Sequence, residues 1–255
     1  KTAERDLADI VTGETTYEYD AAGNLIAKTD PKGRTTWYEY DALNRLIRVT
    51  DPAAGETTYT YDSRDNLTAL TDADGNTTRF AYDGNNRLIR ETRPQGEITT
   101  YAYDAAGNLI QKTDPKNQQT RYTYDPAGRL TRIDYGDGDK TVKFTYDSQG
   151  NLTGYNDGTT AASYAYDGAG RKIAASVNYG SFSKTNTYTY RKNGTKESFT
   201  GPDNITYGYL YDNNQLAGIQ IPNKGFITIN DYTWNRPAAM TLPGGTSKEF
   251  TYDPL

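Results

Sequence analysis

The 255-residue sequence contains no cysteine and no histidine. Without cysteine the chain can form no disulfide and has no thiolate for nucleophilic chemistry. Without histidine it lacks the usual catalytic triads and the commonest zinc ligand. We therefore predict that the chain is not an enzyme, with no catalytic residue, no metal site and no cofactor.

Long hydrophobic runs and concentrated positive charge are also missing. No apolar run approaches the roughly 18 residues of a membrane-spanning helix, and residues 1–6 lack the apolar stretch of a signal peptide. The formal net charge is -5, and Lys and Arg are scattered singly among Asp and Glu. This pattern leaves no basic surface for phosphates, so we expect neither a nucleic-acid partner nor membrane insertion.

Tyrosine and glycine are abundant instead, with 24 of each against 1 Met, 2 Trp and 6 Phe. Helical proteins build their cores mainly from Leu, Ala and Met. Tyr and Thr suit a half-wet β-sheet surface, on which a ring packs while its hydroxyl stays solvated. The composition therefore predicts β-structure.

A short motif recurs along the chain. Tyr17-Glu-Tyr19-Asp20-Ala-Ala-Gly23-Asn24-Leu25-Ile26 returns almost unchanged at residues 101–110. Its second aromatic residue is spaced by 21 residues at Tyr19, Tyr40, Tyr61, Tyr82, Tyr103 and Tyr124. It continues less evenly at Tyr146, Tyr166, Tyr190, Tyr211, Trp234 and Tyr252, and Arg191 and Asn235 replace the aspartate in two of these later repeats. Self-similarity at a fixed period indicates a repeat protein.

Each repeat reads as two strands and two turns. Tyr17 and Tyr19 share one face of a strand, because side chains alternate. Asp20-Ala-Ala-Gly23 has the residues of a type I turn closed by a glycine bulge. In that register Tyr19 lies opposite Leu25 across the hairpin.

The second turn of each repeat often contains proline, which presets φ for a turn, as in Asp30-Pro31-Lys32-Gly33. Its register stays open, because Asp51-Pro52-Ala53-Ala54-Gly55 has one more residue before its glycine and predicts a loop of different length.

A single hairpin is not stable alone, so each repeat must pair with its neighbours. We expect an all-β fold of tandem hairpins in one long antiparallel sheet that curls or spirals into part of a shell. We expect residues 1–255 to form a single array, with regular repeats over about 5–133 and irregular repeats over about 134–255. This array is expected to be a fragment of a larger chain.

The motif Tyr-x-Tyr-Asp-x-x-Gly-Asn/Arg-Leu, as at residues 122–130, resembles the YD repeat of bacterial Rhs proteins, the C component of toxin complexes, and teneurins. The resemblance implies a spiralling β-shell that is wrapped in bacterial members around a toxin, and in teneurins forms an extracellular body used in adhesion. Bacterial members are similar in using paired Asp-Pro motifs for self-cleavage. No catalytic aspartate is transferred here, because Asp125-Pro126 lies in an ordinary repeat turn and Asp253-Pro254-Leu255 could be the start of another repeat.

Three other interpretations are weaker. Asp72-Ala-Asp74-Gly75-Asn76 is similar to the start of a calcium loop, but Thr77 stands where that loop needs glycine. Recurring carboxylates could suggest a glycosidase, but an aspartate that recurs at the same turn position in repeat after repeat fits a structural role better. Rows of tyrosine could bind sugars, although they also pack a sheet.

The sequence thus predicts a structural shell segment, without chemistry of its own, that encloses or presents a toxin or effector covalently linked in the parent chain. The alternative is an extracellular module for adhesion that binds a cell-surface carbohydrate or protein. By resemblance we expect a secreted or bacterial cell-surface location, and exposed strands at the ends could pair edge to edge with another copy. The repeat positions expected to carry the structure are Tyr19, Asp20, Gly23, Leu25, Tyr40, Asp41, Tyr61, Asp62, Tyr82, Asp83, Tyr103, Asp104, Gly107, Tyr124, Asp125, Gly128, Tyr146, Asp147, Tyr166, Asp167, Tyr211, Asp212, Tyr252 and Asp253.

Overall fold

The structure is a computed structural model that describes residues 14–252 apart from 137, 139 and 234. Within these residues there are 23 β-strands and no helix, so the predicted all-β fold is confirmed. No helix long and apolar enough to cross a membrane occurs in this part of the chain.

The strands are mostly short, as the repeat length requires. The first eleven are β1 (Thr16–Tyr19), β2 (Leu25–Thr29), β3 (Thr35–Tyr40), β4 (Leu46–Thr50), β5 (Glu56–Tyr61), β6 (Leu67–Thr71), β7 (Thr77–Tyr82), β8 (Leu88–Thr92), β9 (Ile98–Tyr103), β10 (Leu109–Thr113) and β11 (Gln119–Tyr124). They continue as β12 (Leu130–Tyr135), β13 (Thr141–Tyr146), β14 (Leu152–Asn156), β15 (Ala161–Tyr166), β16 (Lys172–Asn178), β17 (Ser183–Tyr190), β18 (Lys196–Thr200), β19 (Thr206–Asp212), β20 (Gln215–Ile221), β21 (Gly225–Thr233), β22 (Arg236–Thr241) and β23 (Ser247–Glu249).

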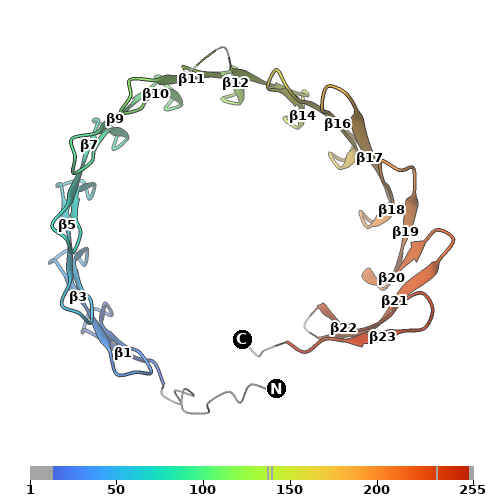
Figure 1. The fold of residues 1–255 in the computed structure, drawn as a ribbon, viewed down its shortest axis with the longest axis horizontal. Coiled ribbons are helices and arrows are strands. Elements are labelled where there is room, and N and C mark those ends of the chain that lie inside the picture. Colours follow the sequence, from blue (N-terminus) through green and yellow to red (C-terminus); the bar gives the residue numbers. More distant parts are fainter. Residues whose placement is uncertain (1–13, 137, 139, 234, 253–255) are drawn as a thin grey trace, which may run out of the picture. The chain divides into compact units, whose positions relative to one another are not determined.

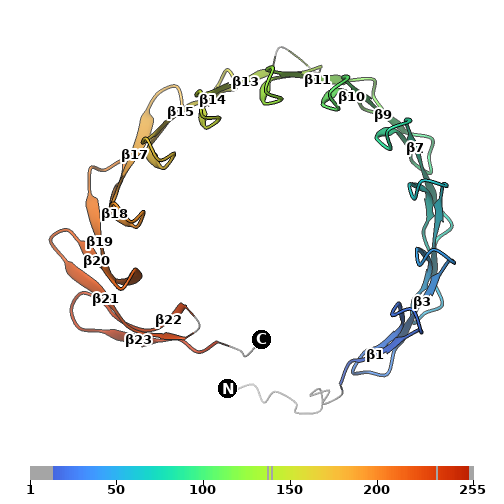
Figure 2. The same ribbon diagram turned by 180° about the vertical axis from the view of Figure 1, so that it is seen from behind.

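The chain divides into an N-terminal unit, residues 1–121, and a C-terminal unit, residues 122–255. In the N-terminal unit each strand pairs antiparallel with the next, from β1 to β11. In the C-terminal unit the same holds from β12 to β23. Figures 1 and 2 show this edge-to-edge succession of hairpins from both sides. The predicted tandem antiparallel hairpins are therefore present.

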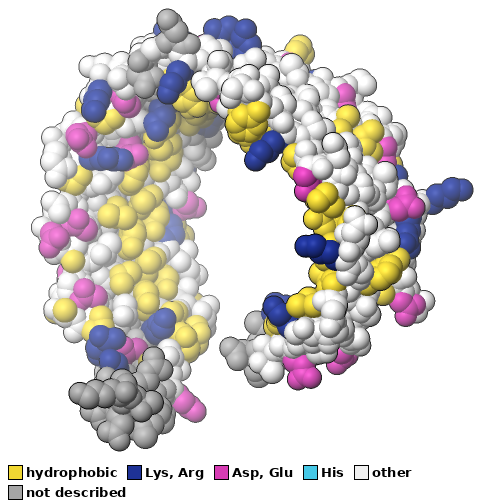
Figure 3. All heavy atoms as spheres, turned by 45° about the vertical axis from the view of Figure 1, so that its right-hand side comes forward, with side chains coloured by type: hydrophobic (Ala, Val, Ile, Leu, Met, Phe, Trp, Pro, Cys, Tyr) yellow, Lys and Arg dark blue, Asp and Glu magenta, His cyan; other side chains and the backbone are white. Residues whose placement is uncertain are grey.

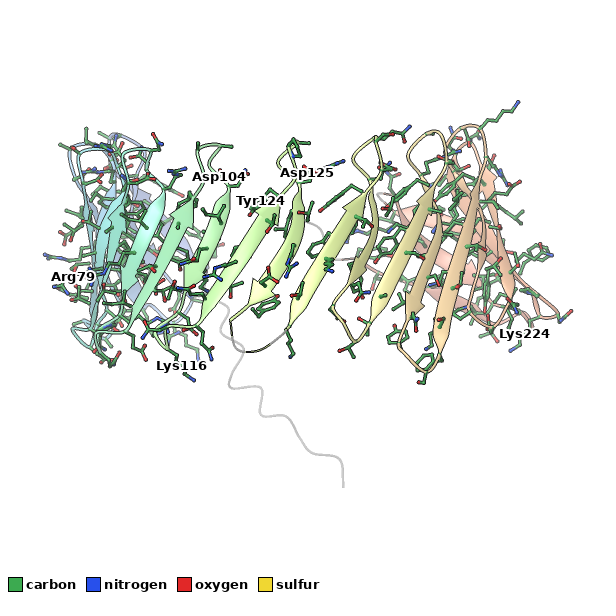
Figure 4. All side chains as sticks on the ribbon, turned by 90° about the horizontal axis from the view of Figure 1, so that it is seen from above. Arg79, Asp104, Lys116, Tyr124, Asp125 and Lys224 are labelled. Carbon is green, nitrogen blue, oxygen red and sulfur yellow. The ribbon has the colours of Figure 1, made fainter. Side chains whose placement is uncertain are left out.

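The two faces of the sheet differ in chemistry. In β3, Tyr38 and Tyr40 are half-buried, whereas Trp37 and Glu39 on the other side are exposed. We call the side with Tyr38, Tyr40 and their counterparts the aromatic face. In the N-terminal unit its hydrophobic side chains form a continuous band on the concave side of that unit (Figure 3). Arg79, on the opposite face, projects away from the sheet (Figure 4).

The sheet is a single layer with almost no enclosed core. Among the described residues only Ala27 and Ala162 are buried apolar residues, with 1% and 7% of their surface exposed. The aromatic face is therefore half-covered only by contacts between neighbours in the same sheet.

Consecutive hairpins place their turns alternately on two edges. The Asp rim carries the turns that follow the second tyrosine of each repeat, and the Pro rim carries the intervening turns. In the N-terminal unit Asp104 lies on the Asp rim and Lys116 on the Pro rim (Figure 4). Both rims use a turn whose fourth residue has positive φ, for example Gly23 on the Asp rim and Gly33 on the Pro rim.

The expectation that Pro-rim loops vary in length is wrong for the N-terminal unit. Thr29 pairs with Thr35 and Thr50 with Glu56, so the two loops are equally long. Ala54, not Gly55, takes the left-handed position, with a φ of 66°. A Cβ at Gly55 would lie 2.7 Å from Oδ2 of Asp51, so Gly55 is selected by lack of space. The left-handed residue of this turn is therefore one position before the glycine.

Candidate functional site

The aspartate of each repeat organises its own loop, as Asp41 illustrates. Its Oδ1 accepts hydrogen bonds from the backbone N–H of Leu43 at 2.9 Å and of Arg45 at 3.0 Å. Its Oδ2 accepts one from Nε of Arg45 at 2.7 Å. Asn44 takes the left-handed position with a φ of 60°. One carboxylate thus satisfies two loop amides and a cation, as expected for aspartate at the start of a turn.

These hydrogen bonds favour the charged carboxylate. The backbone N–H and the side chain of Arg45 lower the pKa of Asp41 below its ordinary value of 3.8. For Asp20 the side chain of Asn24 is the largest cause of a similarly lowered pKa. Ionisation of these aspartates therefore stabilises the loops.

The residue four positions after each aspartate alternates between asparagine and arginine. The series is Asn24, Arg45, Asn66, Arg87, Asn108, Arg129, Asn151 and Arg171. Each side chain binds Oδ2 of its own aspartate. The true period of the array at this rim is therefore two repeats.

The arginines also clamp one repeat to the next. Nη1 of Arg45 donates to the carbonyl oxygen of Asp62 at 3.0 Å and to Oδ1 of Asp65 at 2.7 Å. Its guanidinium lies 4.8 Å from the centre of the Tyr61 ring. Such a contact combines charge-assisted hydrogen bonds with a cation–π interaction. The clamp recurs at Arg87, Arg129 and Arg171.

The asparagines connect neighbouring repeats by a single side-chain hydrogen bond. Nδ2 of Asn24 donates to Oδ1 of Asn44 at 2.9 Å, and Nδ2 of Asn66 donates to Oδ1 of Asn86 at the same distance. Arginine clamps and single asparagine hydrogen bonds therefore alternate along the Asp rim of the N-terminal unit.

Across the sheet, the second tyrosine lies opposite a leucine as predicted. Tyr19 pairs with Leu25 and Tyr40 with Leu46, with a bulge beside each pair. The tyrosine hydroxyls, however, are not left to solvent. That of Tyr40 donates to the carbonyl oxygen of Leu25, in the preceding repeat, at 3.0 Å. The expectation of solvated hydroxyls is wrong for these tyrosines, because the bulge turns a carbonyl toward the ring of the next repeat.

This bond forms a tyrosine ladder along both units. The donors are Tyr40, Tyr61, Tyr82, Tyr103, Tyr146, Tyr166, Tyr190, Tyr232 and Tyr252. Burial raises the pKa of Tyr61, which agrees with its hydroxyl lying against the sheet. The ladder joins adjacent repeats independently of the rim loops.

The ladder corrects one position of the repeat. Tyr232, rather than Trp234, occupies the place of the second aromatic residue, because its hydroxyl binds the carbonyl oxygen of Leu216. Tyr232 also follows Tyr211 by 21 residues, so the spacing is more regular than the sequence suggested. Trp234 and the predicted Asp253 lie outside the described residues.

The other predicted residues are distributed along the rim and not gathered into one site. Asp20, Asp62, Asp83, Asp104, Asp125, Asp147 and Asp167 each begin an Asp-rim loop, and Gly23, Gly107 and Gly128 take its left-handed position. Asp212 differs, because it ends β19 and pairs with Gln215. Sequence reasoning missed the clamp arginines, although their alternation with asparagine is visible in the sequence.

The residues considered for calcium serve their own turn. Oδ1 of Asp72 accepts from the backbone N–H of Asp74 and of Asn76. Over the described residues no group of three or more acidic side chains is close enough together to hold a metal ion. The Asp72 carboxylate therefore stabilises its own Pro-rim turn.

Comparison with known proteins agrees with this architecture. The model of the Teneurin YD-shell family matches residues 7–157 and 137–253. No curated protein sequence matches the chain. Among solved structures, the crystal structure of TcdB2-TccC3-TEV is similar, with a TM-score of 0.68 and 17% identity over 89% of this chain and 14% of that one.

Two further structures have the same fold. The Photorhabdus luminescens Tc holotoxin pore is 18% identical with a TM-score of 0.53, covering 89% of this chain and 15% of that one. The crystal structure of TcdB2-TccC3 is 13% identical with a TM-score of 0.53, covering 95% of this chain and 18% of that one. The chain therefore spans less than a fifth of the length of these structures. The strand succession, the recurrent loops and the family match together show that this chain belongs to the Teneurin YD-shell family and is a structural segment of a YD shell.

Proposed function

We propose that this segment forms part of the wall of a shell that encloses or presents a toxin or effector, covalently linked in the complete polypeptide. The observation that carries the proposal is the aromatic face. It is a continuous band on the inner side of the N-terminal unit, and it is only half-buried. A sheet that leaves an apolar face on one side needs other material against it.

The proposal also agrees with the relatives, which include a YD-shell family and a Tc holotoxin pore. We further propose that residues 1–255 act as one continuous array in the complete polypeptide, and that this polypeptide is secreted or held at a bacterial cell surface. Edge-to-edge pairing between copies would then be prevented by neighbouring parts of the shell.

Adjacent residues on opposite faces provide the test. A photo-crosslinking amino acid is introduced in the complete polypeptide at Phe80, on the aromatic face, and separately at Arg79, on the opposite face. Both lie in β7, so the two variants perturb the same strand. We expect crosslinks to the enclosed domain from position 80 and none from position 79. Equal crosslinking from both positions, or none from position 80, would show that this face lines no chamber.

A further inference from the structure

The side of the sheet opposite the aromatic face, which we call the polar face, has an open depression over β7 and β8 of the N-terminal unit. Its volume is about 400 Å³, and its lining consists of Thr68, Arg79, Phe80, Ala81, Arg90 and Thr92. Arg79 in β7 pairs with Thr92 in β8, so Arg90 is its diagonal neighbour on the same face. Long side chains at such diagonal positions are within reach of one another. Two guanidinium groups can therefore meet at this depression.

These two arginines have no acidic partner. Among the residues that the structure describes, no ion pair and no side-chain hydrogen bond involves Arg79 or Arg90. Every other side chain that the strand pairing places on the polar face from β6 to β10 belongs to Ala, Thr, Ile or Gln. Glu91, the nearest acid in the sequence, pairs with Phe80 on the aromatic face. The charge on this part of the polar face is therefore entirely positive.

Arginines at the related position of other repeats are neutralised. Arg48, Arg90 and Arg132 each stand two positions after the leucine of alternate repeats. A guanidinium nitrogen of Arg48 lies 3.5 Å from Oε1 of Glu39, and one of Arg132 lies 2.7 Å from Oδ1 of Asp134. Arg90 is therefore the exception in this series.

The cause of the exception is a loss of two glutamates. Arg48 is paired across the strands with Glu39, and Glu56 lies 3.8 Å from it on the other side. The same places beside Arg90 hold Ala81 and Ile98. In this repeat the polar face thus keeps the cation and lacks its counter-charges.

A second cation is added at the same place. Arg79 stands where Trp37 and Thr58 stand in the two preceding repeats, immediately before the first aromatic residue. Figure 4 shows Arg79 extending away from the sheet, where a ligand from solution can reach it. Replacement of two acids by neutral residues and of a neutral residue by arginine concentrates positive charge at the depression.

The number of cations indicates the kind of ligand. A carboxylate carries one charge on two oxygens, which the fork of a single arginine can satisfy. A phosphate group carries nearly two charges at neutral pH and has three strong acceptor oxygens. The hydroxyl of Thr92, which makes no hydrogen bond within the described residues, is available to a third oxygen. We propose that Arg79 and Arg90, with Thr92, bind a phosphate group on the polar face. This inference does not rest on enclosure of a cargo.

Binding is measured in the 255-residue chain by NMR titration of the arginine Nε–H signals at low ionic strength, with inorganic phosphate and methyl phosphate as probes. We expect a Kd on the order of 1 mM at pH 7.5. Arg79→Gln and Arg90→Gln should each weaken binding at least about tenfold, because each removes a charge-assisted contact.

Arg121→Gln is the matched control. Arg121 is an exposed arginine on the polar face of the same unit, opposite Gln111, and its side chain bonds Gln119 at 2.7 Å. The control changes the net charge by the same amount, so it should leave the affinity unchanged if the two arginines form a specific site.

A second variant keeps both arginines and restores their counter-charges. Ala81→Glu combined with Ile98→Glu reproduces the surroundings of Arg48, and we expect it to abolish phosphate binding while circular dichroism shows the fold retained. Sulfate has the same shape and charge as the phosphate dianion and should also bind. Between pH 7.5 and pH 5 phosphate should bind more weakly, because its second pKa is about 6, whereas sulfate should not. The proposal is overturned if neither phosphate probe binds, if acetate binds as tightly as phosphate, or if Arg121→Gln weakens binding as much as Arg90→Gln.

Discussion

Two regions of the Asp rim close their hairpins with turns of different length. From Asp20 to Arg191 the hairpins close with a five-residue loop, whereas the hairpins at Asn213 and Asn235 close with two residues. The tyrosine ladder nevertheless continues through Tyr232 and Tyr252. The spacing of the repeats is therefore maintained by bonds within the sheet, and the aspartate loops decide what the rim presents.

Acidification should distinguish the two regions most strongly. The lowered pKa of Asp41 and its counterparts means that the unfolded chain takes up protons at a higher pH than the folded chain. Their contribution is present above the ordinary pKa of 3.8 and is lost as the pH falls through the lower folded value. We expect Tm to be lower at pH 2.5 than at pH 5, measured by calorimetry.

Hydrogen exchange localises this acid effect. After correction for intrinsic rates, the amide of Arg45, which is bonded to the Asp41 carboxylate, should lose protection on acidification before amides in β20 do. A uniform loss of protection along the chain would contradict the distinction between the two kinds of turn.

Removing one rung of the ladder tests whether the sheet sets the spacing. Tyr61→Phe deletes the 2.8 Å bond to the carbonyl oxygen of Leu46. We expect it to lower the free energy of unfolding by about 1 kcal/mol, measured with urea. Tyr59→Phe is the control, because Tyr59 lies on the same face of β5 and no hydroxyl bond is recorded for it among the described residues.

The comparison becomes sharper with Tyr232→Phe. If the ladder acts independently of the loops, this variant should destabilise the short-turn region as much as Tyr61→Phe destabilises the regular one. A negligible effect at Tyr232 would mean that the bond matters only beside an aspartate loop.

Replacing an arginine clamp by an asparagine should reduce stability less than removing a tyrosine hydroxyl does. Arg45→Asn keeps a donor for Asp41 and, as at Asn24 and Asn66, one for the residue 20 positions on, here Asp65, but it loses the bond to the carbonyl oxygen of Asp62 and the contact with Tyr61. We expect Tm to fall by about 3 °C in a thermal scan. Arg34→Asn should change it less, because the recorded bonds of Arg34 are all within its own loop, to Asp30. Equal effects would mean that the clamp between repeats adds nothing.

The smallest effect is expected on the Pro rim. Ala54→Gly relieves a left-handed φ of 66° that alanine adopts at a cost. Glycine also loses more entropy on folding, so we expect a net stabilisation of only about 0.5 kcal/mol by urea unfolding. Ala53→Gly, which lacks the positive φ, should be neutral or destabilising. Stabilisation by both variants would point to some other cause.

Much of the fold could be predicted from local patterns. The alternation of Tyr17 and Tyr19 and the turn residues of Asp20-Ala-Ala-Gly23 led correctly to the hairpin and to the pairing of Tyr19 with Leu25. Reasoning failed at Gly55, because a glycine can be required either for positive φ or for lack of space. It failed again in a later repeat, where Trp234 was taken as the second aromatic residue, although Tyr232 makes the ladder bond.

The amino-acid sequence by itself determined the strands and the Asp-rim turns, because these depend on interactions within about ten residues. It also determined the family, because the motif recurs along the chain. Only the tertiary structure revealed the tyrosine ladder and the arginine clamps. Each of these joins groups about 15 to 21 residues apart, as in the bonds from Tyr40 to Leu25 and from Arg45 to Asp65. Such contacts exist only once neighbouring hairpins pair and a bulge has set the direction of each carbonyl and ring.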